Sequence, residues 1–82
     1  MIRIYGKSNC NWCVKARELL NMYGMQYEYV TVGESMGITE FLEMYPGTKT
    51  VPLIEVDGKK LGGYEELARY VEETKNDYGH SI

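Results

Sequence analysis

The chain contains two cysteines, Cys10 and Cys13, separated by two residues. Disulfide exchange needs a thiolate as the attacking group and a second thiol close enough to release the first product. A C-x-x-C pair at the start of a helix supplies both, because free backbone N–H groups and the positive end of the helix dipole stabilise the thiolate. Lys7 adds a positive charge three residues earlier. The spacing predicts Cys10 as the nucleophile and Cys13 as the resolving thiol.

Two other uses of this cysteine pair remain open on spacing alone. A C-x-x-C can form half of a zinc site, but zinc generally takes four ligands, and the chain adds only one histidine, His80. The pair can also be two buried cysteines without chemistry. Thiol chemistry is favoured by position, because the pair falls between a first strand and a helix of a β-α-β unit. We therefore expect no tightly bound metal.

Apolar patterns around the cysteines predict three helices and four strands. Each predicted helix carries one apolar stripe with the spacing i, i+3, i+4, i+7. Cys13 belongs to the stripe of the first helix, whereas Cys10 precedes the first turn and should be more exposed. The stripes are Ala16, Leu19, Leu20 and Tyr23; Ile38, Phe41, Leu42 and Tyr45; and Tyr64, Leu67, Ala68 and Val71. Strands are expected at residues 1–5, 26–32, 51–56 and 59–61.

The order of these elements predicts an α/β fold of one domain over residues 1–82. A helix between the first two strands makes them parallel, and Asp57-Gly58 is a strong hairpin signal that adds an antiparallel strand. The result is a four-stranded mixed sheet, β-α-β-α-β-β-α, flanked by three helices. Residues 51–56 are almost continuously apolar, as in a central strand covered on both faces. The polar tail from Asn76 to Ile82 is expected to fray.

Composition and charge narrow the function classes. Nine basic and twelve acidic residues give a net charge of −3, which disfavours nucleic-acid binding, because such proteins normally carry a basic patch. No run approaches the roughly 18 apolar residues that a membrane span needs, and residues 1–5 do not resemble a secretory signal. Two closely spaced cysteines also do not make the disulfide framework of a small secreted protein. We expect a cytoplasmic protein that binds neither nucleic acid nor membrane.

Three motifs, in this order and spacing, resemble those of the glutaredoxins, a family of the thioredoxin superfamily. They are Tyr5 to Cys13, Thr50-Val51-Pro52 and Gly62-Gly63-Tyr64-Glu65. The resemblance covers Ile2 to about Lys75 and implies a thioredoxin-like fold with dithiol–disulfide oxidoreductase activity. It also implies a cis peptide bond before Pro52, with the Val51 backbone facing the cysteines and pairing with the backbone of a substrate.

The resemblance further implies glutathione as the cosubstrate. Glutathione carries two carboxylates and one ammonium group. Lys7 and the backbone near Tyr64 and Glu65 would receive the carboxylates, the Glu65 side chain would pair with the ammonium group, and Lys49 would supply a further cation. The implied binding residues are Lys7, Trp12, Lys49, Thr50, Val51, Pro52, Gly63, Tyr64 and Glu65.

The residues between the cysteines depart from the commonest glutaredoxin pattern, which has Pro and then Tyr. Asn11 stands in place of the proline, and Trp12 keeps a large aromatic side chain. Some family members without that proline bind a 2Fe–2S cluster between two subunits, with glutathione completing the ligation. Another branch is reduced by thioredoxin reductase, but its tail motif of Trp and Arg-Pro is absent from residues 76–82.

The resemblance thus predicts a monomer that uses glutathione to reduce protein disulfides and glutathione mixed disulfides. Ribonucleotide reductase is a candidate among its protein substrates. A cluster-binding module and a donor that depends on thioredoxin reductase stay open as alternatives.

Overall fold

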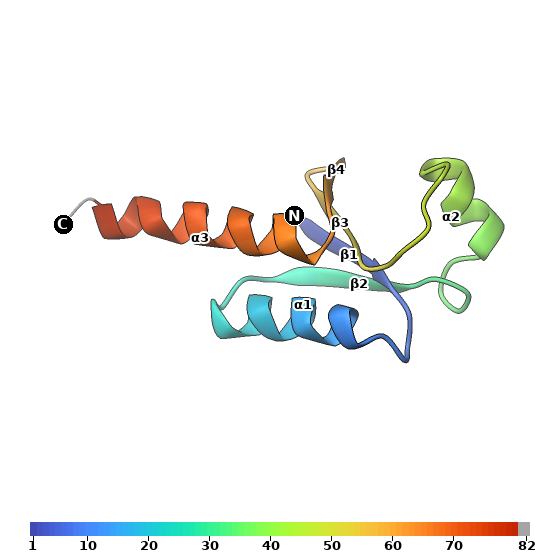
Figure 1. Ribbon diagram of the computed structural model, residues 1–82, viewed down its shortest axis with the longest axis horizontal. Coiled ribbons are helices and arrows are strands. Elements are labelled where there is room, and N and C mark those ends of the chain that lie inside the picture. Colours follow the sequence, from blue (N-terminus) through green and yellow to red (C-terminus); the bar gives the residue numbers. More distant parts are fainter. Residues whose placement is uncertain (81–82) are drawn as a thin grey trace.

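The computed structural model describes residues 1–80, with side chains through residue 74. Its elements follow the predicted order β-α-β-α-β-β-α (Figure 1). The strands are β1 (Ile2–Gly6), β2 (Tyr27–Thr31), β3 (Leu53–Val56) and β4 (Lys59–Gly62), and the helices are α1 (Asn11–Met22), α2 (Ile38–Met44) and α3 (Tyr64–His80). Within the described residues, no helix is both long enough and apolar enough to cross a membrane.

The four strands form one mixed sheet in the order β2-β1-β3-β4. β1 runs parallel to β2, whereas β3 runs antiparallel to both β1 and β4. The β3–β4 hairpin turns at Asp57 and Gly58, whose φ angles of 52° and 82° are both positive, as a two-residue turn of type I′ requires. The predicted mixed sheet with three helices is confirmed, and β3 is a central strand.

One face of the sheet is covered by α1 and α3, which contact each other. Because side chains alternate along a strand, Ile2 and Ile4 of β1 both point to this face. The buried residues of this core are Ile2, Ile4, Ala16, Leu20, Ile54, Leu67 and Val71. The stripes predicted for these two helices therefore supply most of an entirely apolar core.

The opposite face has a smaller core beneath α2. Tyr5 and Leu53 point to this face and pack with Val32 and Phe41. Phe41 is the buried residue of α2, whereas two other residues of its predicted stripe, Ile38 and Leu42, are 55% and 41% exposed. The stripe predicted for α2 is thus only partly buried. A helix of seven residues makes about two turns, so a single side chain anchors it.

The other strand ends lie within one residue of the prediction, but two boundaries differ by more. β3 begins at Leu53, because Pro52 has no N–H with which to join the ladder. The helix α3 continues to His80, so the prediction that the chain frays from Asn76 is wrong for residues 76–80. No proline follows Asn76 to stop the helix. The last two residues of the predicted tail, 81 and 82, lie outside the described residues.

Candidate active site

The two cysteines lie where β1 leads into α1, and a disulfide bond joins them. Cys10 is the N-cap residue of α1, and its sulfur accepts a hydrogen bond from the Cys13 N–H at 3.2 Å. Cys10 is half-buried and Cys13 is fully buried, which matches the predicted difference in exposure. A thiolate at Cys10 would receive the same N–H, so the start of α1 is arranged to stabilise it.

Gly6, at the end of β1, lets the backbone pass close to the buried cysteine. A Cβ at Gly6 would lie 2.9 Å from the Cys13 sulfur and would collide with the Tyr29 hydroxyl. That hydroxyl donates a hydrogen bond to the Lys7 carbonyl at 3.0 Å, and burial raises the pKa of Tyr29. The loop that leads to Cys10 is therefore held against β2.

The loop before β3 faces the cysteines from the other side. The Val51–Pro52 peptide bond is cis, as the motif resemblance implied. The Val51 carbonyl oxygen lies 3.7 Å from the Cys10 sulfur, and Pro52 is buried. The Val51 backbone thus lies beside the sulfur at which a substrate disulfide would react.

A groove of about 240 Å³, which we call the α3 groove, lies on one side of Val51. It is lined by Trp12, Thr50, Val51, Pro52, Gly63, Tyr64, Glu65 and Glu66. The ring centres of Trp12 and Tyr64 are 5.3 Å apart, and the Lys15 ammonium group lies 4.4 Å from the centre of the Trp12 ring. Trp12 remains 53% exposed. Seven of the nine residues predicted to bind glutathione line this groove.

A second groove of about 170 Å³, the α2 groove, lies on the other side of Val51. It is lined by Lys7, Val32, Ile38, Phe41, Leu42, Thr48, Lys49, Thr50 and Val51. The two remaining predicted residues, Lys7 and Lys49, are here. Thr50 and Val51 line both grooves, so the two grooves adjoin next to Cys10.

The two grooves carry opposite charge. The charged residues that line the α2 groove are Lys7 and Lys49, and those that line the α3 groove are Glu65 and Glu66. The whole chain has a net charge of −3, so the positive charge of the α2 groove is opposite in sign to the charge of the chain. A ligand lying across Cys10 would meet two ammonium groups on the α2 side and two carboxylates on the α3 side, where the Lys15 ammonium group also lies against the Trp12 ring.

Known proteins share these sequence features. The Glutaredoxin family model matches residues 2–61. The chain is 38% identical over 78 residues to Glutaredoxin 1 of Escherichia coli (strain K12), and the match covers 85% of this chain and 91% of that protein. This chain belongs to the glutaredoxin family. It is also 33% identical over 69 residues to the hybrid peroxiredoxin hyPrx5 of Haemophilus influenzae, in a match that covers 84% of this chain and 28% of that protein.

Solved structures show the same arrangement of sheet and helices. Reduced glutaredoxin of Escherichia coli has a TM-score of 0.75 at 30% identity, over 92% of this chain and 96% of that one. A buckwheat glutaredoxin solved in a complex with glutathione has a TM-score of 0.71 at 20% identity, over 90% of this chain and 70% of that one. The thioredoxin-like fold is thus confirmed, and this glutaredoxin, with its C-x-x-C motif, is a thiol–disulfide oxidoreductase.

Glu66 lies in the first turn of α3 and caps it through a hydrogen bond that the sequence analysis did not predict. Its carboxylate accepts a hydrogen bond from the Gly63 N–H at 2.8 Å, and this bond, together with one from its own N–H, lowers the pKa of Glu66. Gly62 has a φ of 140°, and a Cβ there would lie 2.6 Å from the Glu66 side chain. A glutamate three residues after an N-cap position is a capping-box signal, so the sequence did contain the clue.

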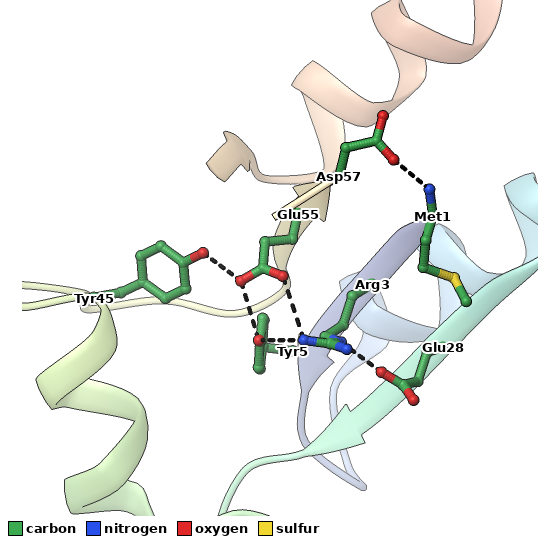
Figure 2. Close-up of polar contacts among 7 residues, drawn as sticks. All are labelled: Met1, Arg3, Tyr5, Glu28, Tyr45, Glu55 and Asp57. Atoms are coloured by element: carbon green, nitrogen blue, oxygen red, sulfur yellow. Dashed lines mark hydrogen bonds and ion pairs between the residues drawn. The ribbon is translucent and has the colours of Figure 1, made fainter. Parts of the chain in front are cut away.

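The sequence analysis also missed a buried carboxylate on the α2 side of the sheet. Glu55 of β3 is 5% exposed. It accepts a hydrogen bond from Tyr5 at 3.1 Å and another from Tyr45, and it lies 3.6 Å from the Arg3 guanidinium group (Figure 2). Burial and the bond to Glu55 raise the pKa of Tyr45 to about 12. The signal was an acidic residue inside a strand predicted to be buried on both faces.

Among the residues that the structure describes, no three side chains of His, Cys, Asp or Glu form a group that could hold a metal ion. Both cysteines are engaged in their disulfide. The side chain of His80, named above as the possible further zinc ligand, lies outside the described side chains.

Proposed function

We propose that this glutaredoxin uses glutathione to reduce protein disulfides and glutathione mixed disulfides. The main support is the opposite charge of the two grooves that meet beside Cys10. Glutathione has a carboxylate at each end and an ammonium group at one end only. A matching site needs cations at one end, and at the other end a carboxylate together with hydrogen-bond donors. The α2 groove supplies the first set, and the start of α3 supplies the second.

In the proposed complex, the glycine carboxylate of glutathione lies in the α2 groove, near Lys7 and Lys49. The backbone of its cysteine pairs with Val51, which places the ligand sulfur next to Cys10. Charge-assisted hydrogen bonds of this kind are shorter and stronger than neutral ones. The two lysines therefore fix one end of the ligand while the backbone fixes its centre.

At the other end, the γ-glutamyl carboxylate meets the first turn of α3, and its ammonium group lies beside Glu65. The first N–H groups of a helix have no partner within the helix and favour anions. Glu66 already accepts the Gly63 N–H. The ligand carboxylate is therefore left with the N–H groups of Tyr64 and Glu65, close to the exposed face of Trp12.

The proposed reaction transfers two electrons by thiol–disulfide exchange. The Cys10 thiolate attacks one substrate sulfur, so that a mixed disulfide forms and the other substrate sulfur leaves as a thiolate. The Cys13 thiolate then attacks the Cys10 sulfur, which closes the Cys10–Cys13 disulfide and releases the second substrate thiolate. One glutathione thiolate reopens this bond at Cys10, and a second removes the first as glutathione disulfide. Two glutathiones are thus oxidised for each substrate disulfide reduced.

Substrate, location and assembly form a second part of the proposed function. The buckwheat glutaredoxin of the same fold was solved with glutathione, which supports glutathione as the ligand here. Ribonucleotide reductase is the candidate protein substrate that the motif resemblance implies. We propose a cytoplasmic location, because thiols stay reduced in that compartment. We also propose that the protein is a monomer, as the motif resemblance implies.

The experiment follows NADPH oxidation by the purified protein, coupled through glutathione with glutathione reductase and, separately, through thioredoxin reductase. Turnover is expected with glutathione. Glu65→Ala should weaken glutathione use by roughly tenfold, because it removes one charge-assisted contact. Turnover only with thioredoxin reductase, with no effect of Glu65→Ala, would contradict the proposed function. A brown protein with visible absorbance after anaerobic purification would favour the cluster-binding alternative.

Two cysteine variants test the order of the steps in the same assay. Cys13→Ser should keep the removal of glutathione from glutathionylated proteins, which needs only the first thiolate, and should lose much of the reduction of protein disulfides. Cys10→Ser should lose both activities. Substantial activity of Cys10→Ser would place the nucleophile elsewhere.

A further inference from the structure

We propose that the α2 groove docks the polypeptide part of a protein substrate, and that it selects an aliphatic side chain with an acidic neighbour close to the reactive cysteine. This inference deepens the proposed function by naming the class of protein segment that the site accepts. It rests on the exchange chemistry of Cys10 and does not require glutathione as the electron source.

The α2 groove has an apolar part formed by four side chains. Its floor is made by buried Val32 and Phe41, and its wall by the exposed side chains of Ile38 and Leu42. Glutathione has no aliphatic side chain to place there. Exposed apolar residues that gather at one groove mark an interaction site, and an aliphatic side chain from a partner would cover all four residues at once.

The charge of the groove indicates the neighbour of that side chain. Lys7 and Lys49 line the groove together with uncharged residues, and no carboxylate lines it. Across Val51, the α3 groove has Glu65 and Glu66. An acidic side chain of the substrate therefore meets two ammonium groups and no carboxylate on the α2 side, and this favours one direction for a polypeptide that crosses Cys10.

The groove is close enough to the chemistry for one short segment to reach both. Val51 lines the α2 groove, and its carbonyl oxygen lies 3.7 Å from the Cys10 sulfur. An extended chain advances about 3.3 Å per residue. A residue one to three positions from a cysteine held at Cys10 lies roughly 3–10 Å along the chain, so its side chain can enter the groove that Val51 lines.

A second copy of this chain is the less suitable occupant. In a two-fold dimer, the same patch faces itself. Two α2 grooves in contact would bring Lys7 and Lys49 of one copy against the same lysines of the other, and like charges in an interface oppose association. An acidic–aliphatic segment of a different protein satisfies both the charge and the apolar surface.

The test measures single-turnover reduction of synthetic disulfide peptides by the pre-reduced protein, without glutathione. One peptide carries leucine and aspartate beside its reactive cysteine; in two others, serine replaces the leucine or asparagine replaces the aspartate. Bis(2-hydroxyethyl) disulfide serves as a small substrate with no polypeptide. Each is used with the wild type, with Leu42→Ser and with Met44→Ser. Met44 lies on the same helix and is 44% exposed, but it does not line the groove.

Leu42→Ser should slow reduction of the leucine peptide by roughly five- to tenfold, as expected for losing part of the burial of one aliphatic side chain. Reduction of the small disulfide should be unchanged, and Met44→Ser should behave like the wild type. With the serine peptide, Leu42→Ser should cause no further loss, since the two changes remove the same contact. The asparagine peptide should react more slowly than the aspartate peptide, and added salt should narrow that difference.

Three results would overturn the docking site: an equal loss with the small disulfide, an equal loss in Met44→Ser, or no loss in Leu42→Ser. A dimer at working concentration that Leu42→Ser dissociates would assign the groove to a second copy instead. A failure of the glutathione-coupled assay with peptide selectivity intact would contradict only the electron source. The two proposals are thus tested separately.

Discussion

On one face of the sheet, α1 and α3 bury a core made only of apolar residues, whereas the face beneath α2 contains a carboxylate, two tyrosines and an arginine at its edge. The apolar face is covered by two helices of 12 and 17 residues, and the other by one helix of seven. We therefore expect the face covered by α1 and α3 to contribute most of the stability, and the face beneath α2 to contribute to the geometry of the site.

The polar face is the one connected to the loop that faces Cys10. Tyr45 ends α2, and the loop that follows it carries Lys49 and Val51 to the cysteines. The hydrogen bond from Tyr45 to Glu55 ties the start of this loop to the central strand. Glu55, Tyr5, Tyr45 and Arg3 form one group, which we call the Glu55 cluster. We infer that the apolar face mainly supplies stability, while the Glu55 cluster also orients the loop that faces the substrate.

The largest effect is expected on the apolar face. Leu20→Ala should lower the free energy of unfolding by about 3 kcal/mol, because Leu20 is fully buried between α1 and the sheet and its truncation leaves a cavity. The exchange rate of the folded protein should change little. Urea unfolding and single-turnover reduction of a small disulfide measure the two quantities. A large loss of exchange rate in the folded variant would show that this face also orients the site.

A smaller loss of stability with a larger loss of function is expected on the polar face. Glu55→Ala should cost about 2 kcal/mol of unfolding free energy, because it leaves the buried Tyr5 hydroxyl without its acceptor. It should also slow the reduction of glutathione mixed disulfides, since the loop after Tyr45 loses its tie to β3. Glu55→Gln keeps an acceptor and should recover most of the rate. If both variants react at the wild-type rate, the cluster is only structural.

The sequence predicted one face better than the other, for a physical reason. The apolar residues of the stripes that contain Leu20 and Leu67 recur with the period of a helix, and on a long helix such a stripe packs against the core. On α2 the same spacing was ambiguous, because a helix with two turns can anchor itself through Phe41 alone and leave Ile38 and Leu42 exposed. Periodicity shows a possible buried face, but not how much of it is covered.

In the site, too, local features were predicted better than long-range ones. The cysteine spacing and the three motifs predicted Cys10, Val51 and Tyr64 as site residues, because each belongs to a short motif that can be recognised in the sequence. The division of the predicted residues between two grooves of opposite charge was not visible, since it depends on how distant loops meet around Val51. Glu55 was missed because its partners come from other elements of the chain.

Alkaline pH should reduce the stability that the Tyr45–Glu55 hydrogen bond contributes on the polar face. The pKa of Tyr45 is raised to about 12, above the value of about 10 for a free tyrosine. The stability that this neutral hydroxyl contributes is present below pH ~10 and is lost as the pH rises towards 12, because the unfolded chain ionises first. Tyr45→Phe should cost about 1 kcal/mol at neutral pH, and its difference from the wild type should shrink above pH ~10 in urea unfolding. A constant difference would contradict the hydrogen bond to Glu55.

Acid, by contrast, should weaken the apolar face only at its edge, where Glu66 caps α3. The pKa of Glu66 is lowered by the Gly63 N–H, so the folded state favours the carboxylate. Its contribution is present above the pKa of a free glutamate, about 4.3, and is lost as the pH falls through the lower folded value. Glu66→Gln should therefore be less stable than the wild type at pH 7, with a difference that closes as the pH falls below about 4.

The control for the Glu66 variant is Glu65→Gln, which removes the same charge from the same helical turn without touching the cap. Urea midpoints at pH 7, 4 and 3 compare the three proteins, and only Glu66→Gln should show the difference that closes in acid. An equal shift in Glu65→Gln would mean that the helix dipole, which both carboxylates meet, accounts for the effect. The Gly63–Glu66 hydrogen bond would then contribute nothing measurable, and the acid sensitivity of this edge would be a general property of the first turn.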